Sequence, residues 1–331
     1  MSERPITSHD VARLAGVSQS AVSRAFTPGA SISAVLRDKV RDAAMRLGYQ
    51  PNLLPRMMVK GRSGIVAIVV GGGYNPFHAA TQEAFSHALQ RAGKRIMLVQ
   101  AQSDRTLDEM VSDIIGYRID GVVTALSILS QQAADAITAH GIPVVTLNSG
   151  ITTETIRVVG IDNVGAGREA ALHMIARGGS HFAYVGADSI ASRAREEGYC
   201  AAVTKAGFAR PQCLSGTLDY DGGLAVGRRL LNQSERPNAI FCVNDLTAIG
   251  IMDAWRMDGG LNFPADAQII GFDDIPASRW LTNNLTTINQ NVEMMAHHAV
   301  EIIENLDTYP HLSTRVDFTM IARGSTGKPV S

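Results

Sequence analysis

From Gly64 onward, short apolar runs alternate with stretches of helical pattern, and this alternation constrains the fold more than any other feature of the sequence. Two of the runs, Ile65–Val70 and Gly121–Thr124, are continuous in Val, Ile and small residues rather than alternating with polar ones. Continuous runs of this kind are typical of strands buried on both faces of a parallel sheet. Strands that alternate with helices are joined by right-handed crossovers, so the sequence predicts a doubly wound α/β fold with parallel sheets.

The alternation runs in two series, which predicts two lobes with a boundary near Ile161. The predicted strands of the first series are Ile65–Val70, Arg95–Val99, Gly121–Thr124 and Pro143–Leu147, with helices Phe77–Ala92, Leu107–Tyr117 and Gln131–His140. The strands of the second series are Arg157–Ile161, Phe182–Val185, Ala239–Val243 and Gln268–Phe272. The tail segments expected to cross back between the lobes are Thr286–Ile288, Glu293–Leu306 and Phe318–Ile321. We expect lobes of approximately residues 64–161 plus 289–316, and 162–288 plus 317–331.

The charge of the chain is divided unevenly along its length. Residues 1–62 hold ten Lys or Arg and four acids, a net charge of +6, whereas residues 63–331 carry −7. The 331 residues suggest about two domains with room for a small third one, and 45% apolar residues are enough for large cores. A small basic head on an acidic body indicates a polyanionic partner at one end only.

The sequence shows no sign of a membrane span, an export signal or a cofactor. No apolar run approaches about 18 residues, and the start of the chain has no apolar stretch. Cys200, Cys213 and Cys242 show no close spacing, so we expect buried thiols in a reducing cytosol rather than disulfides or a zinc site. We therefore expect a cytoplasmic protein with no membrane contact, no cofactor and no bound metal.

The basic head contains three short segments of helical pattern. Thr7 and Ser18 are suitable N-caps for the first two helices, and Gly16 ends the first. The second helix is expected over Gln19–Phe26 and the third over Ala34–Leu47. The residues predicted to be buried are Val11, Leu14, Ala15, Val22, Ala25, Val35, Val40, Ala43, Ala44 and Leu47. Two helices joined by a tight glycine turn and followed by a third predict a helix-turn-helix unit.

The second helix of such a unit fits the major groove of DNA, where its first side chains reach base edges. Gln19 and Ser20 stand at that position, and Gln can pair with adenine through two hydrogen bonds. Arg24 follows one turn later and can reach a phosphate or a guanine. A protein-binding module of three basic helices is the alternative at this point.

The run from Asp10 to Arg24, Asp-Val-Ala-Arg-Leu-Ala-Gly-Val-Ser-Gln-Ser-Ala-Val-Ser-Arg, closely resembles the DNA-binding head of the lactose-repressor/galactose-repressor (LacI/GalR) family. Gly48-Tyr49-Gln50-Pro51-Asn52 resembles the end of that head, and the likeness extends more thinly over the rest. It implies a head of residues 1–49, a hinge linker of residues 50–63 and a two-lobed body of residues 64–331, similar to periplasmic sugar-binding proteins. The operator-DNA contacts that it implies are Thr7, Ser18, Gln19, Ser20, Ser23, Arg24, Asn52, Arg56 and Met58.

In the family, the hinge is a short helix that inserts apolar side chains into the minor groove. By position, Met58 stands where the family usually has the intercalating Leu, and Arg56 matches a common hinge Arg. Pro55 stands where Ala is common, although proline is accepted in the first turn of a helix. A plain flexible tether is the alternative for this segment.

In doubly wound folds, ligands lie outside the carboxyl ends of the strands. Phe77 follows the first strand and either stacks on a sugar ring or belongs to the core. Ala125 follows the third strand, where some sugar-binding relatives carry a polar residue, and Asn148 follows the fourth. Asp162-Asn163 either contacts the ligand or caps the next helix.

The stretch Ser189–Tyr199 resembles the family's Ser-x-x-Arg-x-x-Gly-aromatic signature. The resemblance implies that Arg195 clamps the ligand, because a planar fork of donors holds two vicinal hydroxyls or one carboxylate. Arg193 is either a second clamp or a solvated surface charge.

Two further pairs of polar residues follow predicted strands. Asn244-Asp245 resembles the family's Asn-Asp pair, with Asp245 a candidate cap for the next helix, and Asp273 is expected to accept hydrogen bonds from ligand hydroxyls. The effector contacts expected in all are Phe77, Asn148, Arg193, Arg195, Asn244 and Asp273. These residue types suit a carbohydrate, and a neutral sugar and a sugar acid both stay open.

No motif requires an enzyme. Gly71-Gly72-Gly73 lacks the GxGxxG spacing, and neither HExxH nor GxSxG occurs. The basic head and the resemblance to the LacI/GalR family together imply a homodimeric transcriptional repressor that binds double-stranded operator DNA and a sugar or sugar-acid effector. No heptad helix follows the last strand, so we expect a dimer rather than a tetramer. An activator, or a cytoplasmic sugar-binding protein whose head binds proteins, is the alternative.

Overall fold

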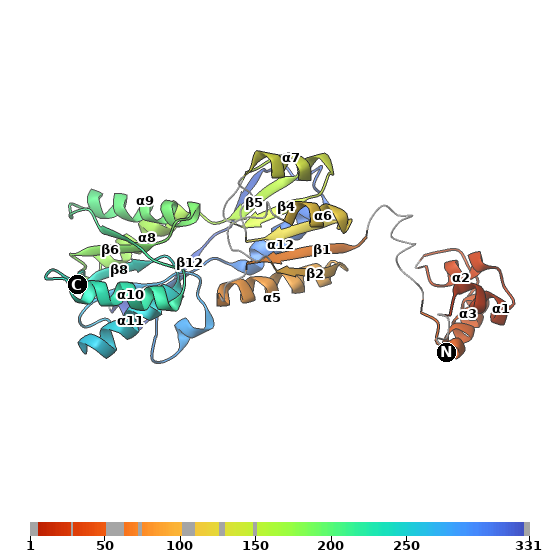
Figure 1. Cartoon of the computed structure of the whole chain (residues 1–331), viewed down its shortest axis with the longest axis horizontal. Coiled ribbons are helices and arrows are strands. Elements are labelled where there is room, and N and C mark those ends of the chain that lie inside the picture. Colours follow the sequence, from red (N-terminus) through yellow and green to blue (C-terminus); the bar gives the residue numbers. More distant parts are fainter. Residues whose placement is uncertain are drawn as a thin grey trace. The chain divides into compact units, whose positions relative to one another are not determined.

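The computed structural model describes residues 6–27, 29–50, 63–71, 75–100, 110–125, 130–147 and 151–327. Asn52, Arg56, Met58 and Asn148 lie outside the described residues, so their roles stay predictions. The chain divides into two compact units, residues 1–63 and residues 64–331, and each is described by itself (Figure 1). A search of the described residues finds no helix with the length and apolar character that a membrane span requires.

The head is a helix-turn-helix unit, as predicted. Its helices are α1 (Ser8–Ala15), α2 (Gln19–Ala25) and α3 (Ala34–Leu47). The Ser18 hydroxyl accepts a hydrogen bond of 3.2 Å from the backbone N–H of Ala21 and so begins α2. Gly16 ends α1 at φ 61°, a left-handed conformation that glycine adopts without a Cβ clash.

The three helices enclose a small apolar core. Its buried members are Val11, Ala12, Ala15, Val22, Ala25, Val40, Ala43 and Ala44. The prediction was wrong for Leu14 and Val35, which are 50% and 80% exposed. The buried stripe of α3 contains Val40 and Ala44, and one turn earlier it reaches the half-buried Leu36 rather than Val35. Each helix of this small unit buries only a narrow stripe, which leaves neighbouring apolar residues in solvent.

The first lobe is built on a six-stranded parallel sheet with the strand order β11-β5-β4-β3-β1-β2. Its strands are β1 (Ile65–Val70), β2 (Arg95–Gln100), β3 (Gly121–Thr124), β4 (Val144–Leu147), β5 (Ile156–Gly160) and β11 (Ser313–Arg315). Its helices are α5 (Pro76–Arg91), α6 (Val111–Gly116) and α7 (Gln131–Ala139). Val66 and Ile68 belong to one core with residues of α5, whereas Ala67 and Val69 pack with α6 and α7 on the other face. Both faces of β1 are covered, as its continuous apolar run predicts.

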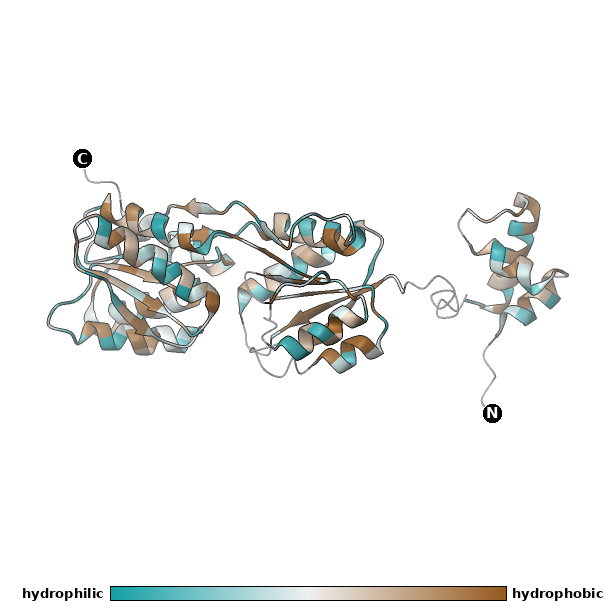
Figure 2. Cartoon of the chain, turned by 90° about the horizontal axis from the view of Figure 1, so that it is seen from above, coloured by the Kyte–Doolittle hydropathy of each residue, from teal (hydrophilic) through white to brown (hydrophobic). Residues whose placement is uncertain are grey.

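The second lobe holds a four-stranded parallel sheet with the order β7-β6-β8-β9. Its strands are β6 (Phe182–Gly186), β7 (Gln212–Ser215), β8 (Ala239–Cys242) and β9 (Gln268–Ile270). Its helices are α8 (Asn163–Ile175), α9 (Ile190–Lys205), α10 (Tyr220–Leu231) and α11 (Asp245–Gly259). Helix α8 packs on α9 and α10 packs on α11, and the two pairs cover opposite faces of the sheet (Figure 1). The strands of the body are mainly brown, hence apolar, in Figure 2.

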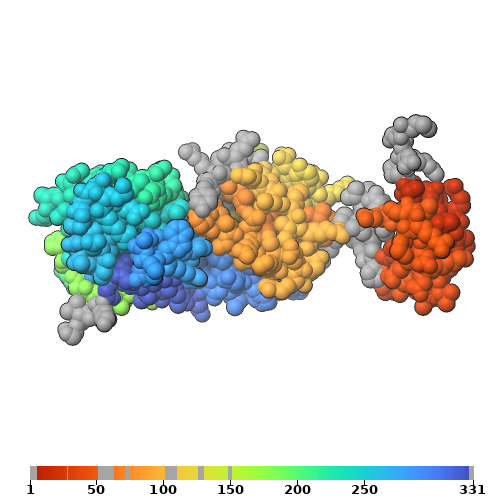
Figure 3. Space-filling view, turned by 90° about the horizontal axis from the view of Figure 1, so that it is seen from below, coloured from red at the N-terminus to blue at the C-terminus, as the bar shows by residue number. Residues whose placement is uncertain are grey.

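The C-terminal part of the chain contacts both lobes. Helix α12 (Val292–Glu304) packs on α5, and β11 pairs with β5 in the first sheet. Strand β10 (Thr287–Asn289) pairs antiparallel with β12 (Thr319–Ile321). Figure 3 shows these C-terminal residues, in blue, lying against both parts of the body. Strands β7 and β11 were not predicted, because they lie at sheet edges and contain several exposed polar residues.

Candidate functional site

One face of α2 is buried in the head and the opposite face is exposed. The predicted contacts described by the structure are all exposed: Thr7, Ser18, Gln19, Ser20, Ser23 and Arg24. Ala21, Val22 and Ala25 hold the other face of α2 in the core. The helix therefore presents a polar face carrying Arg24 to solvent.

Local hydrogen bonds hold several of these exposed side chains. The Gln19 amide donates to the hydroxyl of Ser8 at 3.1 Å, so α1 orients the first residue of α2. The hydroxyls of Ser18 and Ser20 lie 2.9 Å apart. Arg24 donates through Nε to the carbonyl oxygen of Ser20 at 3.3 Å, which keeps its side chain along the exposed face.

In the body, Arg195 is the centre of a buried polar cluster. Its side chain, on α9, is 6% exposed and donates through Nε to the Asn163 amide oxygen at 2.8 Å. Its Nη1 donates to the carbonyl oxygen of Val243 at 2.7 Å, just after β8. Its Cζ lies 3.3 Å from the ring centroid of Phe272, a cation–π contact. Within the described part of the chain, its Nη2 has no hydrogen-bond partner, which leaves donors for a ligand.

The close packing of α8 against α9 brings Asn163 and Arg195 together. A Cβ on Gly198 would lie 1.9 Å from the carbonyl oxygen of Val164. A Cβ on Gly167 would lie 2.1 Å from the carbonyl oxygen of Arg195. Only glycine allows this backbone approach, and the hydrogen bond from Arg195 to Asn163 depends on it.

Asp273 lies just after β9 and interacts electrostatically with Arg195. Burial raises the pKa of this carboxyl to about 7, although Arg195 and a hydrogen bond from Gln290 favour the ionised form. Burial likewise lowers the pKa of Arg195, while Asp273 opposes that shift. The two side chains form no ion pair within 4.0 Å of each other in the described structure. Together the two side chains offer hydroxyl groups both a donor and an acceptor.

The backbone around Asp273 is unusual and is held by ion pairs. Asp273 and Asp274 have φ values of 106° and 54°, conformations that L residues rarely adopt. Asp274 accepts from Arg323 at 2.6 Å and from Arg279 at 2.9 Å, and these hydrogen bonds lower its pKa against the effect of burial. Strained backbone that its surroundings fix in place is common at ligand sites.

The Asp273 carboxylate also touches a segment that leads to the first lobe. It accepts a hydrogen bond of 2.6 Å from the amide of Gln290, which is 2% exposed. Gln290 lies between β10 and α12, and α12 packs on α5. A ligand at Asp273 thus meets the chain where it passes from one lobe to the other.

Three predicted effector residues make other contacts in the structure, and their role toward an effector stays a prediction. Phe77 is 8% exposed and belongs to the apolar core. Arg193 lies on the surface, where it pairs with Asp188 at 2.6 Å. Asn244 begins α11, because its side chain accepts from the N–H of Thr247 at 2.8 Å. The side-chain oxygen of Asn244 therefore serves as the N-cap of α11.

The suggestion that Asp245 caps α11 is corrected, since Asn244 is the cap. Asp245 is fully buried and accepts from the Ile275 N–H at 2.8 Å and from the Thr287 hydroxyl at 2.5 Å. Burial, together with the charge of Asp273, raises its pKa well above the usual value. Asp245 therefore ties the start of α11 to the two chain segments that flank the cluster.

Sequence reasoning missed Phe272 and Gln290 as members of the cluster. Phe272 reads as an ordinary core residue, and Gln290 follows no predicted strand of a sheet core. The sequence also left open whether Asp162-Asn163 contacts the ligand or caps the next helix, and in the structure the two residues differ. Asp162 caps α8 by accepting from the Gly165 N–H at 2.9 Å, and Asn163 binds Arg195.

The first lobe contributes a pocket at the carboxyl ends of its strands. It encloses about 290 Å³ of empty space, part of it open to solvent. Residues at or after the strand ends line it, among them Val70, Ala125 and Leu147, and α5 contributes Thr81 and Gln82. The polar lining also includes His78 of α5 and Thr124 of β3, whereas Phe77 does not line the pocket.

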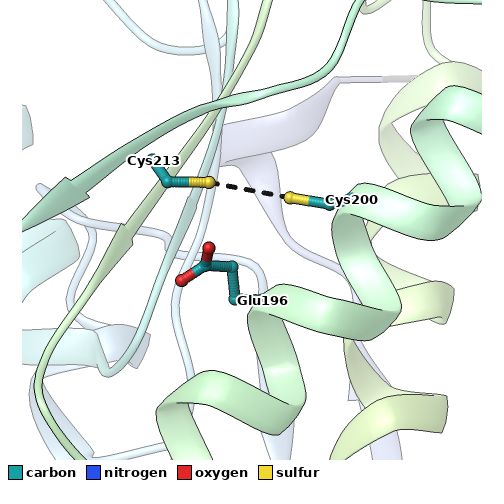
Figure 4. Close-up of side chains that lie close together, drawn as sticks. All are labelled: Glu196, Cys200 and Cys213. Atoms are coloured by element: carbon teal, nitrogen blue, oxygen red, sulfur yellow. Dashed lines mark hydrogen bonds between the residues drawn. The ribbon is translucent and has the colours of Figure 1, made fainter.

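The expectation of buried thiols is confirmed for Cys200 and Cys242 and was wrong for Cys213. The sulfur atoms of Cys200 and Cys213 lie 3.6 Å apart, and Cys213 is exposed (Figure 4). Thirteen residues separate them in sequence, and only the packing of α9 against the sheet edge brings them together.

Both the head and the body of the chain match families of known proteins. Residues 7–52 match bacterial regulatory proteins of the lacI family, and residues 171–326 match a periplasmic binding protein-like domain. The HTH-type transcriptional regulator GntR of Pseudomonas aeruginosa is 30% identical over 302 residues, covering 89% of this chain and 87% of that protein. The chain is therefore a member of the lacI family of bacterial regulatory proteins.

Solved structures show the same architecture. The lac repressor dimer bound to operator and the anti-inducer ONPF matches with a TM-score of 0.88 and 21% identity, over 98% of this chain and 100% of that one. The complex of the transcriptional regulator CelR with cellobiose matches with a TM-score of 0.68 and 27% identity, over 97% and 100%. A helix-turn-helix head with a two-lobed α/β body is thus the fold of this chain.

Proposed function

We propose that the protein is a homodimeric, cytoplasmic transcriptional repressor whose operator binding is controlled by a small neutral sugar. One observation carries the effector assignment. The buried Arg195 keeps guanidinium donors without a protein partner, and it interacts with Asp273 without forming a direct ion pair. A vicinal diol offers both the acceptors that Arg195 needs and the donors that Asp273 needs. The CelR–cellobiose complex supports a carbohydrate, since that relative binds one in its solved structure.

A neutral sugar fits the cluster better than a sugar acid. A second carboxylate beside Asp273 would repel it, and Asp273 already has a pKa raised to about 7 by burial. A neutral hydroxyl instead donates to the ionised form. We retain Arg195 and Asp273 as effector contacts and add Asn163, Phe272 and Gln290 as the residues that orient them.

The operator half of the proposal rests on the exposed face of α2. Gln19 and Ser20 reach base edges, and Arg24 contacts a phosphate or a guanine. The lac repressor structure bound to operator supports this use of the fold. We propose that Asn52, Arg56 and Met58 of the hinge add minor-groove contacts. We propose domain limits of 1–49, 50–63 and 64–331, and the division of the chain after residue 63 supports the start of the body at residue 64.

Effector binding reaches the hinge through the crossing segment. A sugar hydroxyl that donates to Asp273 competes with Gln290 for the same carboxylate. Released from Asp273, Gln290 lets α12 shift with the first lobe, and the first strand of that lobe follows the hinge directly. The coupling equals the difference in effector affinity between the two lobe arrangements, typically about 1–3 kcal/mol.

Calorimetry against a panel of neutral sugars and sugar acids tests the effector site. Asp273→Asn and Arg195→Lys are expected to lose the heat seen with the parent protein. Arg193→Lys is the matched control, because its guanidinium pairs with Asp188 at the surface, and it should bind normally. Normal binding by Asp273→Asn and Arg195→Lys would overturn the site, and a response to sugar acids alone would overturn the neutral ligand.

Gel-shift titration with operator variants tests the DNA surface. Gln19→Ala should change the preferred base at one position of each half-site, whereas Arg24→Ala should weaken all sequences and reduce the salt slope by about 1 if it binds a phosphate. Arg229→Ala, in α10 of the body, is the control and should change neither. Equal losses on every sequence for Gln19→Ala would contradict base reading.

A further inference from the structure

Helix α9 and the edge strand β7 bring three metal-ligating side chains to one place. Glu196 and Cys200 stand four residues apart on α9, so they lie on the same face of the helix. Cys213 faces them from β7. A carboxylate oxygen of Glu196 and the two sulfur atoms all lie within 4.8 Å of one another (Figure 4).

The spacing of the two sulfur atoms fits a shared metal ion. Zinc binds thiolates at about 2.3 Å with tetrahedral angles, which places two bound sulfur atoms about 3.8 Å apart. The sulfur atoms of Cys200 and Cys213 are 3.6 Å apart. A disulfide needs about 2.05 Å, so its formation would require the two atoms to approach by a further ~1.5 Å. The two sulfur atoms have nearly the separation that a tetrahedral ion needs and would have to approach each other to form a disulfide.

We propose that Glu196, Cys200 and Cys213 form a binding site for one Zn²⁺ ion, with a water molecule as the fourth ligand. Two thiolates and a carboxylate are a donor set that zinc accepts and that Mg²⁺ and Ca²⁺ do not favour. Cys200 is buried, Glu196 is half-buried and Cys213 is exposed, so the ion can enter from solvent.

Ion binding replaces protons with a single divalent charge. Two thiols and Zn²⁺ give a zinc dithiolate and two protons, which pass to solvent, and Glu196 adds its existing charge.

The site would join α9 to the outer edge of the second sheet. Glu196 follows Arg195 directly, so the turn of α9 that holds the ion also carries the proposed effector clamp. An ion that binds the folded chain stabilises it in proportion to the logarithm of its concentration. The site is distinct from the effector cluster, since none of its three side chains hydrogen-bonds to Arg195, Asn163 or Asp273 among the described contacts.

The test uses the full-length, tag-free, reduced protein after removal of metal, with Co²⁺ as a spectroscopic probe and Zn²⁺ as a competitor. We expect one Co²⁺ per chain, a thiolate-to-cobalt charge-transfer band in the near-ultraviolet and tetrahedral bands in the visible. Zn²⁺ should remove these bands and raise the unfolding temperature. Cys213→Ser should lose the charge-transfer intensity of one thiolate, and Glu196→Gln should bind more than about tenfold more weakly.

Glu197→Gln is the matched control, because Glu197 is the next carboxylate on α9 and is exposed. It should bind Co²⁺ as the parent protein does. Circular dichroism establishes that each variant is folded before binding is compared. The proposal is overturned if the parent protein gives no charge-transfer band, or if Cys213→Ser gives an unchanged one. It is also overturned if peroxide yields a Cys200–Cys213 disulfide in protein that binds no Co²⁺ when reduced.

Discussion

Asp273→Asn is expected to stabilise the protein at pH 8 while it abolishes effector binding. Burial raises the pKa of this carboxyl from 3.8 to about 7, a shift of roughly three units. At about 1.4 kcal/mol per unit, the ionised carboxylate costs the fold at most about 4 kcal/mol. An amide of the same shape has no such cost and can still accept from Gln290.

The effect depends on pH in one direction. Below about pH 4, Asp273 is protonated in the folded and the unfolded chain, and the variant gains nothing from its missing charge. From about pH 4 to 7 the unfolded chain releases the proton while the folded chain keeps it, so the stability of the parent falls as the pH rises. Above about pH 7 the difference between the two proteins is constant.

Urea unfolding of both proteins at several pH values from 4 to 8 measures this difference. Comparing the two proteins at each pH cancels titrating groups that do not interact with Asp273, such as His173, whose pKa burial lowers to about 4. Asp188→Asn is the control, since the Asp188 side chain is 97% exposed, and its curve should follow the parent. If Asp273→Asn and the parent lose stability in parallel across this range, the assignment of Asp273 as a strained, functional carboxylate is refuted.

Two further predictions concern packing and assembly. Gly198→Ala should lower the free energy of unfolding measured in urea by about 1–3 kcal/mol and weaken effector binding, because the new Cβ would lie 1.9 Å from the Val164 carbonyl oxygen. Gly116→Ala is the control and should be neutral, since a Cβ there meets no atom within 4 Å. Equal losses of stability in the two variants would contradict the packing argument. Leu281→Glu should raise the monomer fraction in sedimentation without loss of folding, because Leu281 and Trp280 are 97% and 62% exposed and such neighbouring apolar side chains mark a contact surface. An unchanged dimer at low concentration would exclude this surface from the interface.

Local chemistry made much of the fold predictable. The glycine after α1, the serine before α2 and the continuous Val and Ile runs each express a preference that acts within a few residues. Helix α3 and strands β1 and β3 therefore have the predicted bounds. The edge strands β7 and β11 escaped prediction because partly exposed, polar segments have no periodic apolar pattern.

The buried polar cluster around Arg195 was predictable only in part. Arg195 and Asp273 belong to recognisable stretches that follow or adjoin strands, and both lie in the cluster. Arg193, two residues before Arg195, points to Asp188 at the surface instead. Neighbours in sequence on a helix face different ways, so residue type alone could not separate the two arginines.

The sequence by itself determined the helices, the strands of the sheet cores and the charge contrast between head and body, because backbone preference and apolar periodicity act over short distances. The tertiary structure alone decided which polar side chains meet. Gln290 reaches Asp273 across 17 residues and Cys200 approaches Cys213 across 13, and both contacts depend on which helix and strand the packed core sets side by side. A contact of this kind has no repeat in the sequence, since its two halves are related only through the fold.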